Sequence, residues 1–275
     1  MQVLHISDPH FSTEKYAVKS HNTLDGLIEL INRIKKNKNL YLLITGDITF
    51  QGRDIGFEEA IIFFKKLIQK TNLDRRRILI CPGNHDISNN EENKDFDDFN
   101  IFSYALRRDN VFNFTTDKTN NLYFKGKNCF LSINSSYNLN YKYGKIDINN
   151  LAILLENHKS KIVNSKIRVI FCHHHLINLD DKDDSAIKNA YQFFELVRKY
   201  KFHFLFHGHQ HAKQVLRINN IYINSVSSLL ETRSVSNLVA LYKIKRKNKI
   251  KRKEYTYFKD ETNNIGKRGR YRKLC

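Results

Sequence analysis

Short apolar runs alternate with amphipathic segments through the first third of the chain. The runs at residues 2–7, 40–45 and 77–81 have the length and the continuous apolar character of buried strands. Between them, residues 24–34 and 57–68 carry apolar side chains three and four positions apart, a spacing typical of helices that bury one face. Strands that alternate with helices in this way predict an α/β fold with a parallel sheet and right-handed crossovers.

The rest of the chain continues this pattern less regularly. Helices are predicted over 97–108, from Asp147 or Asn149 to about 158, and from Asp184 or Ser185 to 199. Strands are predicted at 167–172 and 202–206, and hairpins over 122–133 and 215–224. Residues 238–247 and 249–258 alternate residue by residue, which predicts a two-stranded edge ribbon with a basic outer face. We therefore expect one domain over 1–258 and a mobile basic tail over 259–275.

Side chains that can bind metals follow five of the predicted strands. In chain order they are Asp8 and His10, Asp47, Asn84 and His85, one of His173 to His175, and His209 and His211. The carboxyl ends of parallel strands meet at one edge of a sheet, so we expect these side chains to share one pocket. A lone Asp at a strand end is usually a helix cap, but the coincidence at five strand ends favours a metal centre.

The donor set indicates which metals would fit. Seven oxygen and imidazole donors are too many for one tetrahedral zinc, but they suit two divalent ions about 3.5–4 Å apart that share a carboxylate. Mixed carboxylate, amide and imidazole donors favour Mn, Fe, Co, Ni or Zn over calcium, with Mn or Fe preferred here. Two such ions can activate a bridging hydroxide and hold the oxygens of a phosphoryl group during in-line attack.

The order of these motifs resembles that of the calcineurin-like metallophosphoesterase superfamily. Its blocks appear here as Asp8-Pro9-His10, Gly46-Asp47, Gly83-Asn84-His85-Asp86, His174, and Gly208-His209-Gln210-His211, within about residues 1–225. The resemblance implies a four-layer α/β/β/α sandwich with two metals at the sheet edge. Carried over, Asp8, His10 and His211 would hold one metal, Asp47 would bridge, and Asn84, His174 and His209 would hold the other. His85 would protonate the leaving oxygen or stabilise the transition state, with Asp86 orienting it.

The choice within the histidine triplet rests on a departure from the family pattern. Relatives commonly place the ligand two residues before a proline, and Leu176 occupies the proline position here. This spacing points to His174, with His173 as the alternative.

Within the superfamily, the chain looks most like the class III cyclic-nucleotide phosphodiesterases. The triple His, the compact length and the segment from Gly144 to Glu156 are similar to that group, and the Val-Asp-Arg-Gly continuation typical of protein phosphatases is missing after Asp47. The resemblance implies a phosphodiesterase acting on a cyclic or small nucleotide. A nuclease is the alternative, since exonuclease relatives share the metal motifs. A scaffold without metals is disfavoured because all seven ligand types are present.

Charge and cysteine content extend this picture to partners and compartment. The net charge is +19, and residues 243–275 contain 14 Lys and Arg against 3 acids. Such a basic segment predicts contact with a polyanion such as nucleic acid, or a solvated surface. The first residues show no export signal, and no apolar run is long enough to cross a membrane. Four unpaired-looking cysteines fit a reducing cytoplasm.

Overall fold

Two six-stranded sheets form the centre of the molecule. The computed structural model describes residues 1–11, 14–34, 39–50, 54–88, 95–230, 238–244, 250–258 and 270–273. The first sheet has the order β12 (Arg270–Lys273), β11 (Ile250–Phe258), β10 (Leu238–Ile244), β1 (Gln2–Ile6), β2 (Leu40–Thr45), β3 (Ile78–Cys81). The second has the order β4 (Asn120–Lys125), β5 (Asn128–Ile133), β6 (Ile167–Phe171), β7 (Phe204–His207), β9 (Ile221–Ser225), β8 (Val215–Ile218).

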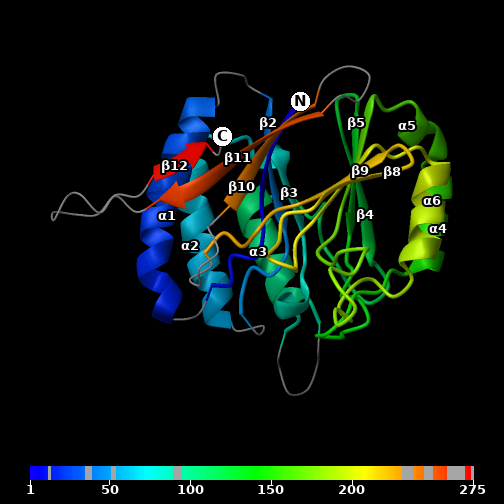
Figure 1. Cartoon of the computed structure of the whole chain (residues 1–275), viewed down its shortest axis with the longest axis horizontal. Coiled ribbons are helices and arrows are strands. Elements are labelled where there is room, and N and C mark those ends of the chain that lie inside the picture. The colour runs from blue at the N-terminus through cyan, green and yellow to red at the C-terminus, as the bar shows by residue number, and fades with distance from the viewer. Residues whose placement is uncertain are drawn as a thin grey trace.

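Helices cover the outer faces of both sheets (Figure 1). On the side of the first sheet lie α1 (Glu14–Ile34), α2 (Asp54–Thr71) and α3 (Asp97–Arg107). On the side of the second lie α4 (Ile148–Asn157), α5 (Lys159–Val163) and α6 (Ala190–Lys199). The predicted four-layer α/β/β/α sandwich is therefore confirmed.

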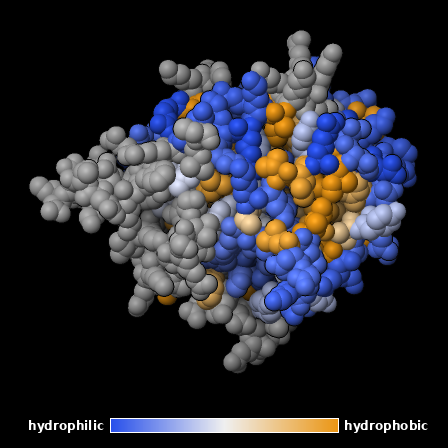
Figure 2. Space-filling model, in the orientation of Figure 1, coloured by the Kyte–Doolittle hydropathy of each residue, from blue (hydrophilic) through white to orange (hydrophobic). Residues whose placement is uncertain are grey.

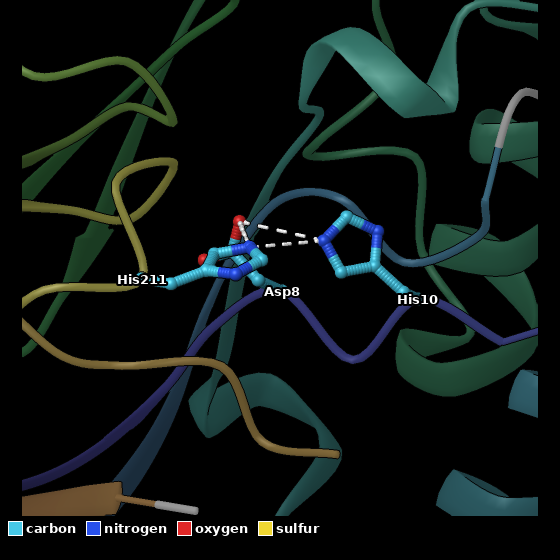
Figure 3. Close-up of side chains that lie close together, drawn as sticks. All are labelled: Asp8, His10 and His211. Atoms are coloured by element: carbon cyan, nitrogen blue, oxygen red, sulfur yellow. Dashed lines mark hydrogen bonds and ion pairs between the residues drawn. The ribbon is translucent and has the colours of Figure 1, made fainter. Parts of the chain in front are cut away.

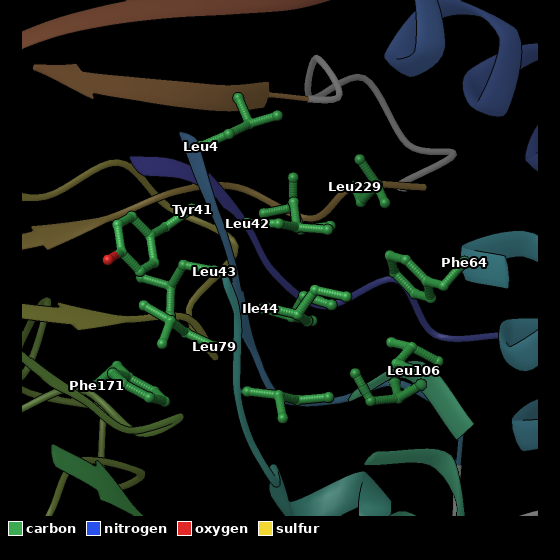
Figure 4. Close-up of a cluster of buried hydrophobic side chains, with 14 of the residues drawn as sticks. Leu4, Tyr41, Leu42, Leu43, Ile44, Phe64, Leu79, Leu106, Phe171 and Leu229 are labelled. Carbon is green, nitrogen blue, oxygen red and sulfur yellow. The ribbon is translucent and has the colours of Figure 1, made fainter. Parts of the chain in front are cut away.

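The alternation of side chains along the strands builds two apolar layers and joins the sheets. On β2, Leu42 and Ile44 point toward Phe64 of α2 and Leu106 of α3, whereas Leu43 points toward Phe171 of the second sheet (Figure 4). A separate cluster fills the space between the second sheet and α4 and α6, with Leu131, Ile170 and Phe193 fully buried. The continuous apolar runs read from the sequence are buried on both faces, as parallel strands require.

Strand direction places all the candidate ligands at one edge. The strands β1, β2 and β3 are parallel, as are β5, β6, β7 and β9, while β10 runs antiparallel to β1.

The second sheet ends in β8, where Val215 is 54% exposed, and no further strand pairs with it in the described part of the chain. Figure 2 shows apolar residues on this face over the region of β8 and β9.

Three sequence predictions are corrected by the structure. The strand β10 is buried beside β1 in the interior of the sheet rather than in an edge ribbon, because Leu238–Ile244 is apolar on both faces. Residues 270–273 form β12 against β11 rather than a mobile tail; the rest of the segment 259–275 lies outside the described residues. The helix α6 begins at Ala190, not at Asp184 or Ser185, because the N–H groups of Ile187 and Lys188 donate to His175 O and Gly144 O of neighbouring loops.

No helix among the described residues is both long and apolar enough to cross a membrane. Cys81, Cys129 and Cys172 are buried and free, as the sequence predicts for core residues, while Cys275 lies outside the described residues. Burial raises the pKa of the Cys172 thiol to about 12, so this sulfur stays protonated and acts as a small apolar side chain.

Candidate metal centre

The loops that follow β1, β2, β3, β6 and β7 meet at one edge of the sandwich. Backbone hydrogen bonds fix the loops to one another: Asp8 N donates to Gly46 O at 3.1 Å, and Gly208 N donates to His173 O at 2.9 Å. Gly83 allows an especially close approach, because a Cβ at this position would collide with the Asp47 carboxylate. Candidate ligands from sequence positions 8 to 211 are thereby brought into one site.

The first group consists of Asp8, His10 and His211, whose donor atoms all lie within 4.8 Å of one another. The Nε2 atoms of His10 and His211 are 3.1 Å apart, and Asp8 Oδ1 lies 3.4 Å from His211 Nε2 (Figure 3). Two imidazole nitrogens that converge on one carboxylate oxygen have the composition and spacing of a divalent metal site.

The second group consists of Asp47, His173 and His209. His173 Nε2 lies 3.2 Å from Asp47 Oδ2 and 3.0 Å from His209 Nδ1. The same Asp47 oxygen is 3.8 Å from His10 Nε2 of the first group. Asp47 therefore lies between the two groups, where a bridging carboxylate would have to be.

His174 lies beside the second group, with its ring centroid 4.5 Å from that of His209 and 5.2 Å from that of His173. Its Nδ1 bonds to Ser135 Oγ at 2.9 Å, and its Nε2 is buried without a hydrogen-bond partner among the described residues. Successive residues after a strand face opposite sides, so His173 faces the first sheet as Phe171 does, while Cys172 packs in the outer cluster. The geometry thus groups His173, the alternative ligand, with Asp47 and His209, where the sequence favoured His174.

Asn84 and His85 lie on the loop that follows β3. The Asn84 amide donates from Nδ2 to Tyr141 O at 3.0 Å, and its buried Oδ1 has no hydrogen-bond partner among the described residues. A buried donor atom left over in this way fits a metal ligand, and this applies to Asn84 Oδ1 as it does to His174 Nε2. The His85 ring is partly exposed and stacks on Phe50, with ring centroids 5.3 Å apart and an interplanar angle of 14°.

Asp86 links two loops of the site by accepting hydrogen bonds from their backbone N–H groups. Its carboxylate accepts N–H bonds from Ile48 at 2.7 Å, Gly83 at 2.8 Å and Thr49 at 3.2 Å. Burial raises the pKa of this carboxyl to about 7, the charge of Asp47 adds to the rise, and the N–H donors oppose it. Asp86 therefore joins the Asp47 loop to the loop of Asn84 and His85.

The backbone at the candidate ligands is strained. Asp8, His10, Asp47, His209 and His211 all have φ between 47° and 70°, a region that non-glycine residues seldom adopt. Each such residue costs on the order of 1 kcal/mol or more, and such costs concentrate at functional sites. Half of the non-glycine residues with positive φ in the described chain are thus candidate ligands, a signal independent of motif matching.

Electrostatics keep the Asp47 carboxylate ionised and the His209 imidazole neutral. Burial lowers the pKa of His209 to about 3, and the neighbouring His173 adds to that effect. Burial also acts to lower the pKa of His173, but the carboxylates of Asp47 and Asp8 outweigh it and raise this pKa to about 9. Burial alone would raise the pKa of Asp47, yet His173 and His85 hold it well below its usual range. His173 thus carries a proton that a divalent cation would displace.

A hydrogen-bond network supports the loop of His209 and His211, and the sequence analysis did not single it out. His175 Nε2 lies 2.8 Å from Asp183 Oδ2, and the Gln210 amide donates to that oxygen at 3.0 Å and to Ser185 Oγ at 2.9 Å. The His175 ring stacks on His209, with centroids 5.6 Å apart. Asp183 lies in an exposed polar loop with no motif around it, so only the fold reveals its connection to the site.

Comparison with known families identifies the class of this protein. The family model for calcineurin-like phosphoesterases matches residues 1–213, and the chain belongs to this family. The family comprises metal-dependent hydrolases with a dinuclear centre, in agreement with the two His and Asp groups of the structure.

Individual relatives agree with this assignment. A protein of Ruthia magnifica subsp. Calyptogena magnifica, described as a probable cyclic nucleotide phosphodiesterase, is 30% identical over 246 residues, covering 86% of this chain and 92% of the relative. The fold is similar to a dimetal phosphatase from Danio rerio, with a TM-score of 0.61, 9% identity and coverage of 99% and 98%. It is also similar to TT1561 of Thermus thermophilus, with a TM-score of 0.56, 9% identity and coverage of 91% and 97%.

Proposed function

We propose that this chain is a dinuclear metal-dependent phosphodiesterase that acts on a cyclic or small nucleotide. The observation that carries the proposal is the position of Asp47. Its Oδ2 lies 3.8 Å from His10 Nε2 and 3.2 Å from His173 Nε2, so one oxygen faces both donor groups.

Asp8, His10 and His211 would hold one ion, and Asp47 would contact both. His209, Asn84 and His173 would hold the second, with His173 in place of His174 on the distances given above. When bound, two divalent ions, with Mn or Fe favoured, supply Lewis acidity toward phosphoryl oxygens and lower the pKa of a water.

The surrounding residues would orient the substrate and move the proton. The His85 ring is partly exposed and packs edge-on against His10, with ring centroids 5.2 Å apart. This position would let it donate a proton to the leaving oxygen beside the metal groups. Asp86 is a positioning residue, since it bonds to the loops that carry Asp47 and His85.

The preference for a cyclic or small nucleotide is supported by the name of the 30% identical relative, whose alignment spans 92% of its length. A nuclease is the second candidate, because the net charge is +19 and Lys251 and Lys253 are exposed on β11. These lysines lie two strands away from β1, whose end carries Asp8 and His10.

The test is a paired hydrolysis assay with Mn²⁺, using cyclic AMP in one reaction and labelled single-stranded DNA in the other. The Asp47→Ala variant is the blank, and a surface variant, Asp117→Asn, is the matched control for removal of one carboxylate. Cleavage of cyclic AMP alone supports the proposal, and cleavage of DNA alone supports the nuclease. The proposal is contradicted if neither substrate is hydrolysed above the blank, or if the hydrolytic activity survives in the Asp47→Ala variant.

A further inference from the structure

Two basic hollows lie at the starting ends of the strands of the second sheet. One, of about 680 Å³, lies beside the β4–β5 turn and α5, and Lys127, Lys161 and Lys166 line it. The other, of about 630 Å³, lies at the start of β6 and β7 and at the β8–β9 turn, and its cations are Arg168, Arg198, Lys201 and Arg217. Neither lining contains an Asp or a Glu.

These hollows face away from the metal centre. Arg168 stands near the beginning of β6, whereas His173 follows the end of the same strand. At about 3.3 Å per residue, the two positions are about 17 Å apart along the strand. A ligand held at the hollows therefore occupies the opposite end of the sheet from the candidate catalytic groups.

Two of the cations have structural partners. The Arg168 guanidinium donates to the carbonyls of Val163 at 2.8 Å and Lys201 at 2.7 Å, and so caps the ends of α5 and α6. Arg198 pairs with Glu195 at 2.7 Å. The remaining five cations are exposed, and no carboxylate pairs with them among the described residues: Lys127, Lys161, Lys166, Lys201 and Arg217.

Each hollow combines a cation with an aromatic ring. Lys161 Nζ lies 4.2 Å from the centre of the Phe124 ring, and the Arg217 guanidinium lies 5.1 Å from the centre of the Tyr222 ring. Tyr222 itself stacks on Phe204, with centroids 5.7 Å apart and an interplanar angle of 21°. Phe124 likewise stacks on His158, with centroids 6.4 Å apart and an interplanar angle of 26°. Each ring thus already packs against a cation and a second ring, and it holds its cation at the hollow, where proteins that bind single strands place positive charge for the phosphates.

We propose that these five cations form a binding face for the phosphates of single-stranded nucleic acid, in which Phe124 and Tyr222 hold Lys161 and Arg217 in place. The two open hollows suit a flexible strand with repeated phosphates better than one compact ligand, because small-molecule pockets are mostly apolar. The face is independent of the metal centre and would hold a strand without bringing its phosphodiesters to the catalytic edge. Its role is then attachment to nucleic acid rather than presentation of a bond for cleavage.

The test is fluorescence anisotropy of a labelled oligothymidylate with the full chain at several salt concentrations. The variant carries Lys166→Gln, Lys201→Gln and Arg217→Gln. The matched control carries Lys65→Gln, Lys66→Gln and Lys70→Gln, three exposed lysines on α2, and removes the same charge. We expect the first variant to bind at least tenfold more weakly and to lower the salt slope by about 2, at about 0.7 per phosphate contact. The control should change Kd less than threefold.

Equal weakening in both variants would show that binding depends only on net charge, and would overturn the proposal. No weakening in either overturns it as well, and so does loss of binding only in a Lys251→Gln/Lys253→Gln variant of β11. Vesicles of phosphatidylserine and phosphatidylcholine are tested in parallel. If the Lys166→Gln/Lys201→Gln/Arg217→Gln variant loses vesicle binding while its oligothymidylate binding is unchanged, the face binds membranes instead, which also overturns the proposal. Thermal unfolding of all variants checks that each is folded.

Discussion

Asp86 offers the sharpest test of how this site is built, because its carboxylate serves three buried N–H groups at once. Replacing it with Ala leaves the N–H groups of Ile48, Thr49 and Gly83 without their acceptor. Each buried donor left unpaired costs about 1–3 kcal/mol, so the Asp86→Ala variant should lose at least about 3 kcal/mol of unfolding free energy. Asp86→Asn keeps one accepting oxygen and should lose about 1–3 kcal/mol.

The assay is urea unfolding of the metal-free protein at pH 8, where the Asp86 carboxyl is ionised because its pKa is about 7. Asp117→Ala and Asp117→Asn serve as controls, since Asp117 is exposed. The loops that Asp86 joins also carry Asp47 and Asn84, so Mn²⁺ affinity should fall on the order of 10–100-fold in Asp86→Asn. Asp86 variants as stable as the controls, with unchanged Mn²⁺ affinity, would refute the role assigned here.

Three further outcomes are expected. The His173→Asn variant should retain one Mn²⁺ per chain and His174→Asn two, as measured by elemental analysis; the reverse would restore His174 as the ligand. Burial lowers the pKa of His207 to about 4, so the unfolded chain takes up this proton first as pH falls below 6.5. His207 should therefore contribute about 3 kcal/mol to the loss of metal-free stability between pH 6.5 and pH 4, at about 1.36 kcal/mol per unit. Other buried histidines such as His209 add their own losses, so the His207→Gln variant should lack only this share of the fall in urea unfolding. Arg168→Ala should cost about 3 kcal/mol in the same assay, since carbonyls at the ends of α5 and α6 lose their donor, and wild-type stability in this variant would contradict the capping role.

The sequence was sufficient for the elements whose signals are local. The apolar run that becomes β2 and the polar loop after β3 could be read directly, since a buried parallel strand and a metal-binding loop each carry their own residue types. The sequence predicted Asp147 or Asn149 as a helix cap, and the structure selects Asp147, whose side chain accepts from Asn150 N at 3.0 Å.

Features that depend on non-local pairing could not be read in this way. The position of β10 beside β1 depends on register across 240 residues, and the apparent alternation of charged residues at its end hid its two apolar faces. The choice between His173 and His174 depends on which side of β6 faces the first sheet, whereas the sequence argument used the spacing to Leu176. Partners such as Asp183 reach the site only through the fold.

The pairing of β1 with β10 has a consequence for how the chain acquires its shape. Gln2 pairs with Lys243, and the amino group of Met1 donates to Ile244 O at 3.2 Å. Contacts between such distant segments form slowly, because a long loop must close before they give any stabilisation. During synthesis, the edge of β1 that pairs with β10 therefore stays unpaired until residues 238–244 have been made. Only its other edge can pair earlier, with β2. Until then this apolar strand is open to pairing with other chains, so the nascent protein should depend on chaperones most strongly just before its last strands emerge.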